Sequence, residues 1–132
     1  DFREGHLGVM KSLMRISAQF NAVYASILVF DDTGLNSQYS LGMDEQGNER
    51  LRFGKEEELY SLFLDYRLIY LPAGQSGIPF FDNRFDERSR NFIEGHIFMP
   101  IVFHEFPAYL YLALKQKRDD VRDYFAILTG LI

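Results

Sequence analysis

The spacing of apolar side chains changes along the first third of the chain and predicts a helix followed by two strands. Apolar positions recur every three or four residues over residues 4–21, a pattern typical of an amphipathic helix. Residues 25–30 form a compact apolar run that ends in the turn signal DDTG, which predicts a buried strand. Residues 37–41 alternate polar and apolar side chains, so we expect them to pair back on that strand as a hairpin.

The middle of the chain is less regular, and we expect residues 44–50 to be a loop. Residues 55–65 carry good helix formers behind three glutamates, which a helix dipole favours in a first turn, and therefore predict a short helix. Residues 67–71 predict a further strand. Two prolines and two glycines mark residues 72–79 as a break, and residues 80–91 are aromatic yet charged, as in a loop with one helical turn.

The run HIFMPIVFHEFPAYLYLAL, residues 96–114, is apolar enough to suggest a membrane span, but its centre argues against one. Glu105 lies at the midpoint, where spanning helices rarely hold a charge. Pro107 would cost about 3 kcal/mol inside a helix, and the β-branched and aromatic residues on both sides favour strands. We therefore predict a hairpin of residues 97–103 and 108–114 that turns at His104 to Pro107, and no membrane insertion.

The end of the chain predicts another helix, because apolar residues from Val121 to Ile132 follow a helical spacing, with Asp119 or Asp120 as the N-cap. This order of elements predicts an α+β fold with a central antiparallel sheet of five to six strands. The terminal helices pack on one face, and loops and short helices cover the other. Residues 1–132 suffice for a single domain.

The composition narrows the range of functions that the chain can have. Nineteen acidic residues against fourteen basic ones give a net charge of −5, which disfavours binding to nucleic acid. The absence of cysteine excludes disulfides, thiol catalysis, thiolate metal sites and a bilin attached through cysteine, and it favours a cytoplasmic location. His6, His96 and His104 lack the spacing of metal ligands, so we expect no metal site.

Three segments carry a resemblance to a known family: the first predicted helix with ASILVFDDTG, the loop FFDNRF, and the hairpin IFMPIVFHEFPAYLYLAL. Together they resemble the GAF domain, an α+β sensory module of phosphodiesterases, histidine kinases and phytochromes. The resemblance implies a non-catalytic regulatory domain, excised from a longer multidomain signalling protein, that binds a small molecule or a partner. It also implies a homodimer that passes the signal through its terminal helices to an output domain in the same chain.

The family's pocket lies between the sheet and the covering loops, and the resemblance implies which residues line it here. The candidate ligand-binding residues are Phe80, Phe81, Arg84, Phe85, His96, Phe98 and Tyr109. The family often has glycine in the returning strand, where this chain has Ala108, Tyr109 and Leu110, so bulky rings could instead close the pocket. The alternative is a ligand-free interaction and dimerisation module of the roadblock or longin type.

The remaining motifs give little further evidence about the function. The sequence NRFDE, residues 83–87, echoes a signature of cyclic-nucleotide-binding GAF domains, but there the residues are spread out, so we interpret it as a solvated loop anchored by Phe85. Arg84 belongs to a locally basic patch that either receives an anionic ligand or pairs with acidic residues of its own loop. The sequence around Ser76 lacks the spacing of a nucleophile elbow, and GAF-like methionine sulfoxide reductases use cysteines. We therefore predict no catalytic residue, and the cofactor stays unidentified.

Overall fold

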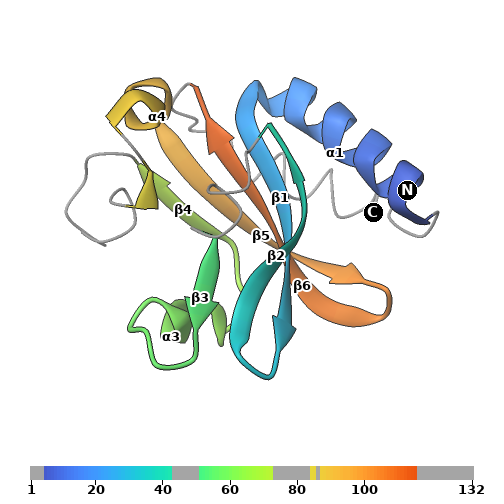
Figure 1. The fold of residues 1–132 in the computed structure, drawn as a ribbon, viewed down its shortest axis with the longest axis vertical. Helices are drawn as coiled ribbons and strands as arrows, with labels where there is room; N and C mark the ends of the chain where they lie inside the picture. Colours follow the sequence, from blue (N-terminus) through green and yellow to red (C-terminus); the bar gives the residue numbers. More distant parts are fainter. Residues whose placement is uncertain (1–4, 43–50, 73–83, 86, 116–132) are drawn as a thin grey trace.

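Six antiparallel strands form one sheet in the part of the chain that the computed structural model describes, which is residues 5–42, 51–72, 84–85 and 87–115 (Figure 1). The strand order is β3-β2-β1-β6-β5-β4. The elements in chain order are α1 (Gly5–Phe20), β1 (Ala22–Asp31), β2 (Gly34–Leu41), β3 (Arg52–Gly54), α3 (Tyr60–Phe63), β4 (Ile69–Pro72), α4 (Glu87–Phe92), β5 (Gly95–Phe103) and β6 (Phe106–Leu114). The predicted α+β class and central antiparallel sheet are confirmed.

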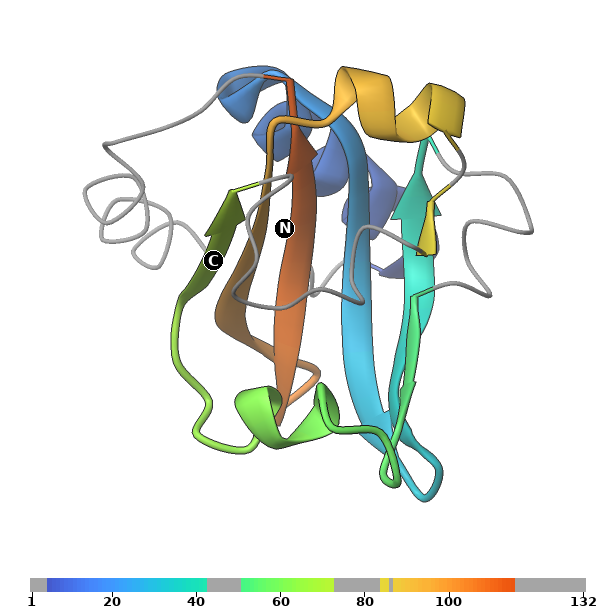
Figure 2. The same ribbon diagram turned by 90° about the vertical axis from the view of Figure 1, so that its left-hand side faces the viewer.

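Helix α1 packs on one face of the sheet, against β1 and β2 (Figures 1 and 2). Its side chains Val9, Leu13, Ile16 and Phe20 are buried, and their spacing of three and four residues places them on one side of the helix. They meet buried apolar side chains of three strands, β1, β5 and β6, in a single cluster. The sheet contributes Ala25, Ile27, Ile97, Met99, Ile101, Leu110 and Leu112, among others.

The opposite face of the sheet, which we call the α3–α4 face, packs against α3 and α4 at opposite ends of the strands (Figure 2). Strand β6 alternates between the two faces: Leu110 and Leu112 point toward α1, and Tyr109 and Tyr111 point toward the α3–α4 face. Because both faces are buried, β6 is apolar at nearly every position, which explains the membrane-like run in the sequence. Within the described residues, no helix is both long and apolar enough to cross a membrane.

Strands β5 and β6 are joined by a turn shorter than predicted. Phe103 pairs with Phe106 and Val102 with Pro107, so only His104 and Glu105 remain between the strands. Both have left-handed backbone angles, with φ of 49° and 71°, as a type I′ turn requires. Pro107 fits in the strand because it lies beyond the part of β6 that pairs with β1, where no ladder hydrogen bond from its nitrogen is needed.

The largest difference from the sequence prediction is in the helix expected over residues 55–65. Only Tyr60–Phe63 is helical. The residues before it form turns, the first of which is closed by a hydrogen bond from the backbone N–H of Glu57 to Gly54 O at 3.0 Å. Strand β3 was not predicted, because its three residues are too few for a periodic pattern. The strand predicted over residues 67–71 and the helical turn within 80–91 are present as β4 and α4.

Several predictions lie outside the described residues. These are the loop over residues 44–50, most of the break at 72–79, the candidate residues Phe80 and Phe81, Ser76, and the C-terminal helix with its cap at Asp119 or Asp120. The prediction that both terminal helices share one face is therefore tested here only for α1.

Candidate functional site

The part of the α3–α4 face nearest α3 is filled by aromatic rings. The candidates Phe98 and Tyr109 are fully buried there, and Phe63 of α3 packs between them with ring centroids 5.0 and 5.2 Å away. The hydroxyl of Tyr109 donates to Phe63 O at 3.1 Å. Burial raises the pKa of Tyr109 to about 12, so the phenol stays neutral. This part of the face holds α3 against the sheet.

The part nearest α4 combines rings with polar atoms. The imidazole of His96 is 1% exposed and stacks between Phe85, at 5.7 Å, and Tyr111, at 6.0 Å. His96 Nδ1 lies 2.9 Å from the hydroxyl of Tyr111. Tyr24 of β1 also stacks with Phe85, at 6.1 Å, and its hydroxyl lies 3.1 Å from Ser89 Oγ of α4. The segment that contains α4 is thus fixed to the sheet through stacked rings.

A β-bulge in β2 places two serines on this face. The pairing of β1 with β2 shifts between Ile27 and Leu28, which leaves Gln38 as the extra residue, so Ser37 lies opposite Leu28 and Ser40 opposite Ser26. Residues three apart in a regular strand would point to opposite faces. Ser26 Oγ lies 2.6 Å from Ser37 Oγ and donates to Tyr39 O at 2.9 Å, and Ser40 donates to Ser26 Oγ at 3.2 Å.

These groups form a line across the sheet, which we call the polar row: Ser40 on β2, Ser26 on β1, Tyr111 on β6 and His96 on β5. Ser26 pairs with Ser40 on one side and with Tyr111 on the other, and Tyr111 reaches His96. Of these four residues the sequence candidates included only His96. For Ser40 the sequence offered one signal: Ser37 and Ser40 lie three apart in a predicted strand and share a face only if that strand has a bulge.

Arg84 does not join the polar row. It lies at the edge of the sheet, where its guanidinium forms an ion pair with Glu57, donates through Nη1 to Arg52 O at 2.9 Å and covers the ring of Phe53 at 4.4 Å. We call the pair of Arg84 and Glu57 the clasp. Its acidic partner Glu57 comes from the turn after β3, 27 residues away.

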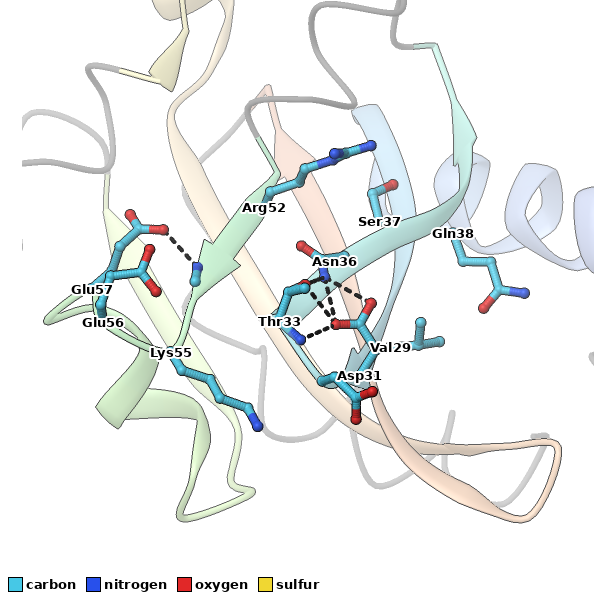
Figure 3. A pocket seen from close by; sticks show the side chains of 12 residues that line it. Val29, Asp31, Thr33, Asn36, Ser37, Gln38, Arg52, Lys55, Glu56 and Glu57 are labelled. Carbon is cyan, nitrogen blue, oxygen red and sulfur yellow. Dashed lines mark hydrogen bonds between the residues drawn. The ribbon is translucent and has the colours of Figure 1, made fainter.

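A hollow of about 900 Å³ lies between the β1–β2 turn and β3 (Figure 3). None of the four polar-row residues lines it. The carboxylate of Asp31 in its wall accepts hydrogen bonds from Thr33 and Asn36, and these bonds lower the pKa of Asp31 to about 2 (Figure 3). That carboxylate holds the turn together. Across the described residues, no cluster of histidine and carboxylate side chains could hold a metal ion.

No family model matches the sequence, and no curated protein matches it. Solved structures do match. The GAF domain of a two-component sensor histidine kinase from Bacillus halodurans superposes with a TM-score of 0.65 at 18% identity, covering 94% of this chain and 86% of its own. The fold is that of a GAF domain. A GAF domain region from Geobacter sulfurreducens PCA agrees, with a TM-score of 0.67 at 16% identity over 95% of this chain and 87% of its own.

The GAF fold also occurs in an enzyme among the matches. The type II free methionine-R-sulfoxide reductase from Thermoplasma acidophilum has a TM-score of 0.69 at 12% identity, covering 99% of this chain and 89% of its own. At such identities the likeness establishes the fold and leaves the activity to the chain's own residues.

Proposed function

We propose that this chain is a regulatory module with the GAF fold that binds a small molecule beside the polar row. The observation that carries the proposal is the row itself. Hydroxyl and imidazole groups are costly to bury in an apolar face, yet this face carries them on four neighbouring strands. Sites for small molecules combine apolar walls with a few placed polar groups, and Phe85 and Tyr24 supply aromatic walls next to the row.

The sequence candidates take different roles in this proposal. His96 supplies a polar contact, Phe85 and Phe98 supply ring surface, and Tyr109 closes the α3 end of the face. Phe80 and Phe81 lie outside the described residues and remain candidate ligand-binding residues on sequence grounds alone. Arg84 is held by Glu57 and serves the ligand only if the clasp opens.

We propose no catalytic activity. Reduction of a sulfoxide by thiol chemistry consumes a cysteine thiol, and the sequence has no cysteine, so the likeness to the Thermoplasma reductase supports the fold only. The sensor kinase among the matches supports a regulatory role in a longer signalling chain instead.

We also propose that the signal passes through the terminal helices of a dimer. Leu7 and Met14 of α1 are 68% and 57% exposed, far more than apolar side chains that pack against the sheet. They are seven residues apart, so they lie on the same side of the helix, away from its buried stripe. Such a stripe suits helix pairing between two copies.

The competing function is a ligand-free interaction module with the same fold. The observation that favours it is the complete burial of Phe98 and Tyr109, which leaves their part of the face already filled by protein. The two functions differ in what the polar row does: it orients a ligand in the first and only joins strands in the second.

Ligand binding separates the two functions. Native mass spectrometry of gently purified protein detects a retained molecule, and a thermal-shift screen of cyclic nucleotides and other small metabolites detects added ones. We expect to find a ligand that raises the melting temperature of the wild type. The same ligand should raise the melting temperature of Tyr111→Phe by less, because this variant lacks only the hydroxyl beside His96. Tyr60→Phe, which removes a hydroxyl outside the row, is the matched control. No retained molecule and no shift with any compound would favour the ligand-free module.

A further inference from the structure

Strand β3 ends the sheet among the described residues, and two of its residues turn their backbone groups outward. The N–H of Lys55 donates to Thr33 O at 3.1 Å, and that of Ser37 donates to Leu51 O at 3.1 Å. Residues 51, 53 and 55 therefore face β2, and Arg52 and Gly54 face away from the sheet. Open groups on an edge strand are a template for pairing with another chain.

The clasp occupies these outward groups. Arg84 donates to Arg52 O at 2.9 Å, and the N–H of Gly54 donates to Glu57 Oε2 at 2.7 Å. The ion pair between Arg84 and Glu57 joins the two contacts. Its two side chains thus provide one donor and one acceptor, as the backbone of a seventh strand would.

The outward groups of β3 are complementary to themselves. In an antiparallel pair of two β3 strands centred on Phe53, Arg52 of one copy lies opposite Gly54 of the other. Each Gly54 N–H then donates to Arg52 O across a two-fold axis, which is the symmetry of an isologous dimer. The side chain of Glu56 lies beside Gly54, where its carboxylate can face the Arg52 guanidinium of the second copy.

We propose that the clasp closes an edge through which two copies of this chain pair by their β3 strands. The wild type keeps the edge shut, and separation of Arg84 from Glu57 opens it. The two backbone atoms that the clasp holds are the same two that the second copy would satisfy. This interface lies at the β3 edge of the sheet. It is distinct from pairing through α1, which packs on one face of β1 and β2.

The test breaks the clasp from each side, with Glu57→Ala and with Arg84→Ala. Matched controls are Glu58→Ala and Arg88→Ala, which remove exposed side chains of the same charge outside the clasp. Sedimentation velocity over a wide range of concentration measures assembly, and amide hydrogen exchange measures the protection of the Gly54 N–H. Circular dichroism establishes that each variant is folded.

We expect both clasp variants to gain one association step, so that a monomer becomes a dimer, or a dimer becomes a tetramer. In Glu57→Ala, which removes the acceptor of the Gly54 N–H, this amide should exchange about tenfold faster than in the wild type at low concentration, and at high concentration it should be protected again. The controls should behave like the wild type. If an alanine variant does not fold, Arg84→Lys replaces it, because lysine keeps the charge but cannot contact Glu57 and Arg52 O with one planar group.

Two results would overturn the proposal. In one, the folded clasp variants keep the assembly state of the wild type at every concentration, which would make the clasp a local structural contact. In the other, they associate while the Gly54 amide still exchanges fast in the assembled form, which would place the new contact elsewhere.

Discussion

The bond between His96 and Tyr111 links β5 to β6 inside the α3–α4 face, and its contribution can be isolated by a double-mutant cycle. Tyr111→Phe deletes one hydroxyl and keeps the ring, and His96→Phe replaces the imidazole by a ring without nitrogen. The two polar atoms are 2.9 Å apart, Tyr111 is fully buried and His96 is 1% exposed. Water therefore cannot replace the lost partner unless the face opens.

Each single substitution deprives a buried polar group of its partner in this bond. Such a group costs about 1–3 kcal/mol in the free energy of unfolding. The double variant removes both partners, so its cost should be smaller than the sum of the single costs by about 1 kcal/mol. His96 and Tyr111 both make further contacts outside this pair, so each single cost includes more than their mutual bond. The coupling energy, which is the difference between the cost of the double variant and the sum of the single costs, does not include those contacts.

Urea unfolding followed by circular dichroism gives the four free energies, with Tyr60→Phe as a control for the loss of a tyrosine hydroxyl outside the row. Additive costs, within about 0.3–0.5 kcal/mol, would refute the argument that the pair acts as one buried unit. A Tyr111→Phe variant no less stable than Tyr60→Phe would refute it as well.

Urea unfolding checks three further predictions. Hydrogen bonds from Thr33 and Asn36 lower the pKa of Asp31 from 3.8 to about 2, so the ionised carboxylate stabilises the fold at pH values above 3.8. The excess free energy of unfolding of the wild type over Asp31→Asn should therefore vanish as the pH falls from 3.8 to about 2. Replacing His104 and Glu105 by Asn-Gly should stabilise the hairpin by roughly 1 kcal/mol, because both positions have positive φ. Tyr109→Ala should cost about 3–5 kcal/mol, since the ring is fully buried.

Hydrophobic periodicity predicted the sheet and its first helix because these elements are long and each buries a regular set of positions. Strand β1 and the hairpin of β5 and β6 are continuous apolar runs, since both of their faces are covered. Strand β3 escaped prediction because its three residues are held by one neighbouring strand and by contacts from distant residues. The helix expected over residues 55–65 was too long for a similar reason: Glu57 caps the edge of β3 instead of starting a helix.

The candidate site was harder to predict because it depends on pairing across strands. His96 was found through its place at the start of a buried strand, but its partner Tyr111 is 15 residues away, on β6. The serines were missed because a bulge changes which side chains share a face, and a single extra residue leaves no signal in composition. For Arg84 the sequence left open an anionic ligand or an acidic residue of its own loop, and it could not point to Glu57, 27 residues away, with which Arg84 forms an ion pair.

Tyr109 and Tyr111 stand two residues apart on one strand, and their surroundings divide the α3–α4 face. Tyr109 is locked by its bond to Phe63 O and by rings on several sides, so a ligand could enter there only by displacing α3. Tyr111 instead lies opposite Ser26 of β1 in the strand pairing, and its hydroxyl is 2.9 Å from His96 Nδ1 on β5, a bond that can be exchanged for one to a ligand at little cost. The small molecule proposed for this face should therefore lie toward α4, because Tyr109 fills the α3 end.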